Sequence, residues 1–179
     1  MEAVVSNQML YNSAALQPEH DDAFDLEDVE HDGAETLAVW AFRRWVLGLR
    51  LKAPEQWDAV LWGLRRRCGE AAGREAAAAL AEMVEGLRRT SRRTITHHQP
   101  CCADLGDDEA TLLVLLAACQ RGDILLAETA AQTLSGTLHT DEVTLAAMRF
   151  AEAFFQRGLM LPYRDLPPAA KPPSAASIH

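Results

Sequence analysis

Residues 97–102, with the sequence His-His-Gln-Pro-Cys-Cys, hold the densest group of metal-binding and nucleophilic side chains in this chain. Imidazole nitrogen and thiolate sulfur are ligands that zinc prefers in proteins, and a turn at the proline could bring a histidine and a cysteine together. One hypothesis is therefore a zinc-type site that uses His97, His98, Cys101 and Cys102. Neighbouring cysteines bind the same ion only with strain, so such a site would need a further ligand from elsewhere.

Two other interpretations of the same six residues stay open. Cys101 with His97 or His98 could form a nucleophile and its base, although the spacing alone does not fix that geometry. A polar surface loop with two incidental cysteines also fits, because this spacing matches no recognised zinc finger. Cys68 and Cys119 fall in segments that the sequence predicts to be helical, so only the fold could bring either of them to the loop.

Four arginines, Arg88, Arg89, Arg92 and Arg93, lie at the end of a helix that the sequence predicts over about 73–94. At helical spacing they form two stacked pairs, 88 with 92 and 89 with 93, which could hold phosphate groups. Cations in the last turns of a helix are also favoured by its dipole, and then lie in solvent. Phosphate binding and simple helix-end stabilisation are both consistent with this segment.

No motif of a known reaction accompanies these residues. The chain has no glycine-rich phosphate loop, no GxSxG and no HExxH, so the sequence leaves open whether it is an enzyme. Residues 126–157 could form a helix-turn-helix, but the second helix would present Asp141 and Glu142 where contacts to DNA are made. The net charge of −9 also argues against nucleic acid as the partner.

Composition and periodicity predict an all-α protein. Alanine and leucine dominate the apolar residues, aromatic residues are only 6%, and no run of alternating β-formers is present. Apolar residues recur instead at helical spacing, and the short connections favour antiparallel neighbours. We expect an irregular bundle of about six helices, over about 34–51, 54–68, 73–94, 107–121, 124–134 and 141–157.

Local signals set several of these boundaries. Asp32 and Glu35 have the spacing of a capping box, and Pro54 suits the first turn of a helix. The carboxylates of residues 107–109 suit the positive start of a helix, and Asp123 and Thr140 are of the types that cap one.

Charge and composition divide the chain into three parts. Residues 1–31 form an acidic arm that has little to bury, so we expect it to be disordered. Residues 32–161 form a single helical domain, and residues 162–179 a Pro/Ala/Ser-rich tail that we also expect to be disordered. Residues 1–42 carry ten acids and no base, whereas residues 43–93 carry a net charge of +6, so the arm could fold back over the basic segment.

The cellular environment and the role follow by exclusion. No stretch approaches the ~20 apolar residues of a membrane span, and the N-terminus lacks the features of a signal peptide, so we expect a cytoplasmic protein without disulfides. The first functional hypothesis is a protein-interaction or regulatory module, with another protein as its partner and an oligomeric state that stays undetermined. The alternatives are a zinc sensor or zinc-stabilised adaptor that uses residues 97–102, and phosphate or nucleic-acid binding through residues 88–93.

Overall fold

The computed structural model describes residues 33–167 as a bundle of helices with no strand among them. The helices are α2 (Ala34–Leu51), α3 (Pro54–Cys68), α4 (Glu70–Thr90), α5 (Asp107–Arg121), α6 (Ile124–Ser135) and α7 (Asp141–Phe155). The predicted all-α class is therefore confirmed. The acidic arm and residues 168–179 of the tail lie outside the described part of the chain.

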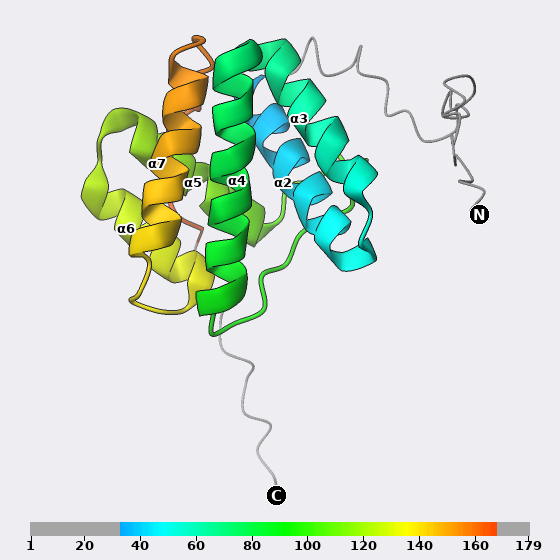
Figure 1. Ribbon diagram of the computed structural model, residues 1–179. Helices are drawn as coiled ribbons and strands as arrows, with labels where there is room; N and C mark the ends of the chain where they lie inside the picture. The colour runs from blue at the N-terminus through cyan, green and yellow to red at the C-terminus, as the bar shows by residue number, and fades with distance from the viewer. Residues whose placement is uncertain (1–32, 168–179) are drawn as a thin grey trace, which may run out of the picture.

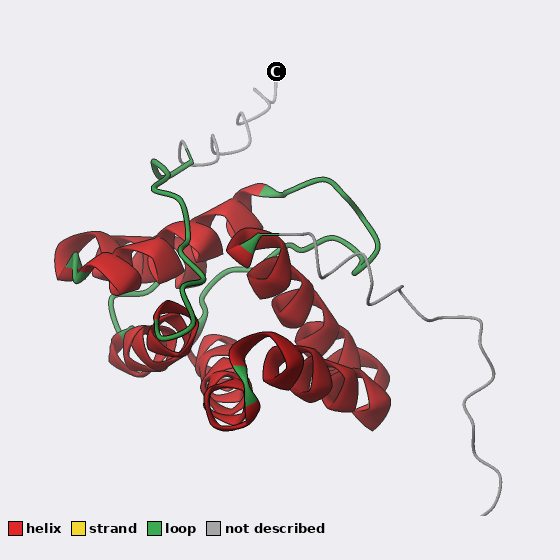
Figure 2. Ribbon diagram, turned by 90° about the horizontal axis from the view of Figure 1, so that it is seen from above, coloured by secondary structure: helices red, strands yellow, loops and turns green. Residues whose placement is uncertain are grey.

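Helix α4 lies at the centre of the bundle (Figure 1). It packs against α7 on one side and against α3 on the other, while α5 packs against α6 and α7. Helix α2 packs chiefly against α3 and makes smaller contacts with α4 and α5. The view from above shows the helices joined by loops (Figure 2). Within the described residues, no helix combines the length and the apolar character needed to cross a membrane.

Small residues allow α3 and α4 to approach each other closely. A Cβ atom on Gly73 would collide with the backbone of Leu64 and Arg65, so only glycine permits this crossing. One and two turns further along α4, Ala76 and Ala79 are completely buried. The alanine-rich sequence of α4 thus has a packing role in addition to its high helix propensity.

Most predicted boundaries agree with the structure, because they depend on local interactions. Helix α5 begins at Asp107 and ends before Gly122, which has a φ of 69°. The Asp123 carboxylate caps α6 by accepting a hydrogen bond from the Leu126 amide at 3.1 Å. The prediction for the third helix was wrong at both ends, because α4 runs over 70–90 and the chain is already extended at Ser91.

Helix α2 begins at Ala34, as predicted, and its first turn contacts a distant part of the chain. The N-cap is Gly33 in an extended conformation. Asp32, the other member of the predicted capping box with Glu35, lies outside the described residues, so the capping box stays a prediction. Glu35 accepts hydrogen bonds from Arg164, with Arg164 Nη2 at 2.8 Å from Glu35 Oε2. The chain beyond residue 161 therefore returns to the first turn of α2, and Leu166 packs against the core.

Candidate functional site

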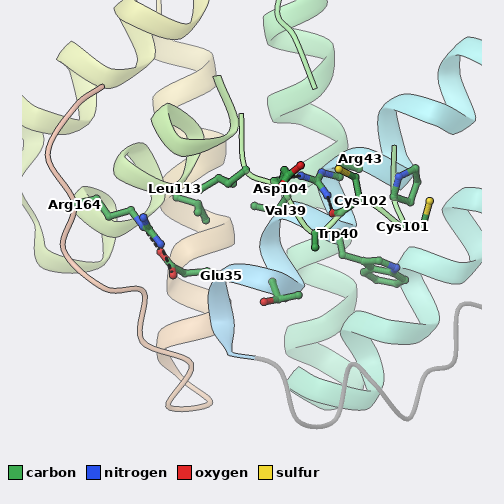
Figure 3. Close-up of a pocket in the computed structure, with 13 residues that line it drawn as sticks. Glu35, Val39, Trp40, Arg43, Cys101, Cys102, Asp104, Leu113 and Arg164 are labelled. Carbon is green, nitrogen blue, oxygen red and sulfur yellow. Dashed lines mark hydrogen bonds and ion pairs between the residues drawn. The ribbon is translucent and has the colours of Figure 1, made fainter. Parts of the chain in front are cut away.

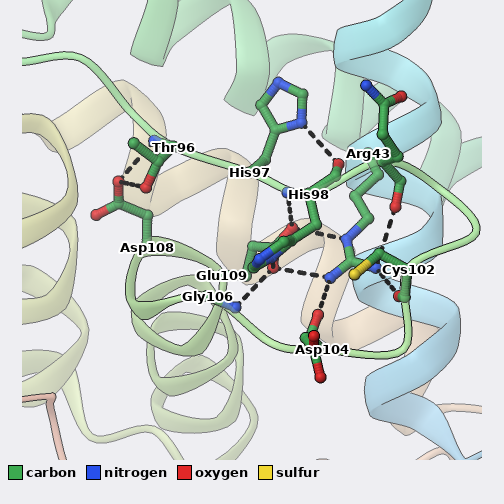
Figure 4. A network of polar contacts seen from close by, with 10 residues as sticks. Arg43, Thr96, His97, His98, Cys102, Asp104, Gly106, Asp108 and Glu109 are labelled. Carbon is green, nitrogen blue, oxygen red and sulfur yellow. Dashed lines mark hydrogen bonds and ion pairs between the residues drawn. The ribbon is translucent and has the colours of Figure 1, made fainter.

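Residues 91–106, which we call the junction loop, connect α4 to α5 and pass over α2 (Figure 4). The loop contains all four predicted metal ligands and two of the four predicted phosphate-binding arginines. Its backbone is held by three buried side chains that come from helices: Arg43 of α2, and Asp108 and Glu109 of α5. The path of the loop is therefore set by polar contacts with the helices around it.

Arg43 uses its guanidinium to join α2, the junction loop and α5. Nε donates to Glu109 Oε1 at 2.6 Å, and Nη2 donates to Glu109 Oε2 at 2.8 Å. The remaining hydrogen bonds go to backbone carbonyls of the loop, at Gln99, Cys102 and Asp104. A guanidinium carries five N–H donors, so these five bonds satisfy Arg43 completely although its residue is only 4% exposed.

Glu109 is the matching acceptor, with a side chain that is completely buried. Besides Arg43, its carboxylate accepts hydrogen bonds from the backbone N–H groups of His98 and Gly106, both at 2.9 Å. The Nδ1 atom of His98 lies 3.0 Å from Oε2. Burial alone would raise the pKa of Glu109, but the hydrogen bonds from Arg43, His98 and Gly106 outweigh it and lower the pKa to about 2.

Asp108 holds the other part of the loop. Its carboxylate accepts hydrogen bonds from the Thr96 amide at 2.6 Å, from the Thr96 hydroxyl at 2.9 Å, and from Arg93 at 2.7 Å. Burial raises the pKa of this group, but Arg93 and Thr96 together bring it below its ordinary value. Two successive carboxylates at the start of α5, where the helix dipole favours negative charge, thus hold the loop.

The predicted metal ligands are distributed along the loop in different environments. His98 is occupied by Glu109, whereas His97 has Nδ1 3.0 Å from the His98 carbonyl and packs edge-on against Phe42. Cys101 is exposed and Cys102 is half-buried, both as free thiols. No three His, Cys, Asp or Glu side chains in residues 33–167 are grouped in a way that could hold a metal ion. The zinc site stays a prediction, and it would require the loop to rearrange.

The two other cysteines do not join the loop. Cys68 is buried near the end of α3, and burial raises the pKa of its thiol to about 11. Cys119 lies on α5, where burial raises its pKa to about 12. Both are therefore protonated thiols at neutral pH, and they behave as small core residues rather than as nucleophiles or ligands.

The four arginines predicted to bind phosphate are also separated. Arg92 and Arg93 follow the end of α4, so the predicted stacking of 88 with 92 and of 89 with 93 is wrong. Arg88 bonds to Glu85 at 2.7 Å, and Arg89 forms an ion pair with Glu142 of α7. Arg93 bonds to Asp108 and to the Leu134 carbonyl. Phosphate binding here stays a prediction, and three of the four guanidiniums would have to leave a carboxylate partner.

A pocket of about 530 Å³ opens between the junction loop, α2 and the C-terminal segment (Figure 3). The Glu35–Arg164 pair lies on one side of it, and Cys101 and Cys102 lie on the other. The indole N–H of Trp40, a buried residue that lines this pocket, has no hydrogen-bond partner among the described residues. Polar and apolar residues both line the pocket. Arg43 is among them, but all its N–H donors are already used within the chain, so it has none left for a ligand.

A second cavity, of about 410 Å³, lies between α2 and α4 beside the first part of the loop; we call it the α2–α4 groove. Its lining is almost entirely apolar, apart from two arginines and a histidine: Phe42, Val46, Leu49, Arg50, Val84, Leu87, Arg88, Ile95 and His97. Arg88 is paired with Glu85, but Arg50 has no hydrogen bond or ion pair within residues 33–167. The groove therefore combines an apolar lining with a cation available to a ligand.

Sequence reasoning missed the pair that organises this site. Arg43 falls in the apolar stripe of α2, where it looks like an interruption of a buried face, and Glu109 falls in an acidic cluster that also suits a helix start. The available signal was the charged residue itself, since a cation on a buried face requires a buried partner. Nothing in the local sequence identifies that partner among the acids of the chain.

Comparison with known proteins gives no relative for this chain. No protein-family profile, no curated protein and no solved structure matches it.

Proposed function

We propose that this chain is a protein-interaction module, and that the α2–α4 groove binds a short segment of a partner protein in which acidic and apolar residues are combined. The observation that carries the proposal is the groove itself: about 410 Å³ of largely apolar space with the unpaired Arg50 at its edge. Concave apolar sites with a few polar groups are the usual form of a binding site, and a peptide can fill one with a few anchoring side chains.

The composition of the lining favours that class of ligand. Apolar anchors would bury surface against Val46, Leu49 and Leu87, at roughly 25 cal/mol for each Å² removed from water. An acidic residue beside them would pair with Arg50, whose planar guanidinium suits a carboxylate. A purely apolar ligand would leave this cation without a partner, and a basic ligand would be repelled by it.

The junction loop makes one wall of the groove rigid. Ile95 and His97 line the groove, and the neighbouring residues Thr96 and His98 are bonded through their backbones to Asp108 and Glu109. A wall that is already in place loses little conformational entropy when a ligand binds. The buried polar network therefore supports binding indirectly, by fixing the shape of the groove.

The test is a titration of the full chain with a synthetic peptide that alternates Asp or Glu with Leu or Phe, followed by NMR of the methyl groups. We expect shift changes at Val46, Leu49, Leu87 and Ile95, and at least a tenfold loss of affinity for Leu49→Asp and for Arg50→Glu, equivalent to about 1.4 kcal/mol each. A peptide with Lys in place of the acids should bind more weakly than the acidic one.

Matched controls keep this test specific. Leu125→Asp changes an exposed leucine of α6, and Arg74→Glu reverses an exposed arginine of α4 that does not line the groove. Neither should alter binding by more than about twofold. Shift changes that map to another face, or control variants that weaken binding as much as Leu49→Asp, would contradict the proposal.

A further inference from the structure

We infer that the groove has an occupant within this same chain: residues 24–27, Phe-Asp-Leu-Glu, bind intramolecularly in the α2–α4 groove and must be displaced by a partner. This inference rests on the proposed function, because it gives the groove the same ligand chemistry. It adds a regulatory contact, in which the N-terminal arm competes with external segments.

Chain length allows the contact. The described chain begins at Gly33, and Leu49 lies roughly 22 Å along α2 from Ala34, at 1.5 Å for each helical residue. Gly33 follows Phe24 by nine positions and Leu26 by seven. At about 3.3 Å for each extended residue they span roughly 30 Å and 23 Å, respectively, so both side chains can reach the groove from the start of α2.

Charge complementarity also favours binding of the arm to the groove. Residues 1–32 carry nine acids and no lysine or arginine. Arg50 and Arg88 line the groove, and the exposed Lys52 follows Arg50 by two residues, at the C-cap of α2. The arm therefore meets the opposite charge where it can also bury its apolar residues, and the contact should weaken as salt rises.

The pattern of residues 24–27 fits the lining. In an extended segment, neighbouring side chains point to opposite sides, so Phe24 and Leu26 can face the apolar wall while Asp25 and Glu27 face away from it, toward the rim. The first 18 residues also contain apolar side chains, among them Val4, Val5, Leu10 and Leu16, but they include a single acid, Glu2. Residues 24–27 therefore combine reach, charge and apolar anchors in one place.

A tethered segment also has a concentration advantage. A short connection gives an effective concentration in the millimolar range, so a contact of sub-millimolar affinity keeps the groove occupied in most chains. The apparent affinity for an external peptide then falls by the fraction of chains whose groove is free. Removing the two anchors should therefore tighten binding of the external peptide by about fivefold or more.

The small number of lysines provides a direct test in the full chain. Lys52 and Lys171 are the only lysines, so a zero-length carbodiimide crosslink from an arm carboxylate to a lysine identifies its site without ambiguity. We expect mass spectrometry to find Asp25 or Glu27 joined to Lys52. The double variant Phe24→Ser with Leu26→Ser should lose most of this crosslink, whereas the control Val4→Ser with Val5→Ser, in the same arm, should retain it.

A mixture of isotopically heavy and light chains shows which molecule supplies the arm. Crosslinks within one isotopic form support the inference. Crosslinks between heavy and light chains would show that the arm binds a second copy of the chain, and would overturn the inference. Failure to detect a crosslink to Lys52, or one that survives the loss of both anchors unchanged, would also overturn it.

The peptide titration then separates this inference from the proposed function. If the wild type and the Phe24→Ser/Leu26→Ser variant bind the external acidic peptide equally well, the groove binds ligands and the intramolecular contact is wrong. If neither binds it, the proposed function fails. Tighter binding by the variant than by the wild type supports both.

Discussion

Arg43 on α2 and Glu109 on α5 bond to each other at two points, although 66 residues separate them in the chain, and both side chains are buried. Through this pair, the guanidinium also holds three carbonyls of the junction loop. The junction loop is therefore organised by the ion pair of Arg43 with Glu109. None of its predicted metal ligands, His97, His98, Cys101 and Cys102, belongs to that pair.

We predict that breaking this pair from one side is costly. Glu109→Ala leaves the Arg43 charge buried without a partner, so it should lower the free energy of unfolding by about 3–5 kcal/mol, as urea denaturation would measure. The control is Arg88→Ala, which removes an exposed pair with Glu85 and should cost less than about 1 kcal/mol. Equal losses in the two variants would contradict the central role of the buried pair.

Stability should fall steeply in acid because of the same carboxylate. The pKa of Glu109 is lowered to about 2 in the folded chain from its ordinary value of 4.5, so the unfolded chain takes up its proton first as the pH drops. The stabilisation is complete above pH 4.5 and is lost as the pH falls toward 2, with a total of roughly 3 kcal/mol. Asp108, whose pKa is also lowered, adds to this loss.

Substitution of Glu109 tests whether this carboxylate causes the loss of stability in acid. Glu109→Gln is less stable at neutral pH, but its urea midpoint should change less between pH 5 and pH 3 than that of the wild type. Glu128→Gln, at an exposed position of α6, should keep the wild-type profile. An unchanged acid dependence in Glu109→Gln would show that other groups control it.

The zinc hypothesis has an equally direct measurement. Because His98 bonds to Glu109 and the described residues contain no group of three potential ligands, we expect zinc to shift the Tm of the tag-free protein by less than about 2 °C. Cys101→Ser and Cys102→Ser should behave in the same way. Stoichiometric zinc that disappears in both variants would establish a metal site in the junction loop.

The crossing of α3 and α4 gives a prediction about packing. Gly73→Ala improves helix propensity, but its Cβ would meet the backbone of α3, so we expect a net loss of about 1–3 kcal/mol. Gly86→Ala in the same helix places its Cβ 3.1 Å from a methyl group of Val143, which has more freedom to move, and should cost less. Thermal unfolding would compare the two. A more stable Gly73→Ala protein would mean that the helices separate easily.

The sequence by itself determined the helical class and most helix ends. At the start of α5, Glu109 accepts a hydrogen bond from the Gly106 amide, Gly122 ends that helix in a left-handed conformation, and Asp123 caps α6. Such interactions are complete within a short segment, so their residue types carry enough information. Contacts with distant residues are not encoded in this way, as for Glu35, which bonds to Arg164 near the other end of the described chain.

The site depended on the tertiary structure. Asp107, Asp108 and Glu109 are neighbouring acids of similar helix preference, yet Asp107 is exposed, while Asp108 and Glu109 bind different parts of the junction loop. Likewise, α4 ends at Thr90, and Arg93 then reaches Asp108 instead of extending the helix. The local sequence favours carboxylates at the start of α5, but which of them pairs with Arg43 is decided by the packing of α2 against α5. That packing depends on apolar contacts between residues far apart in the chain, which residue types and spacing do not specify.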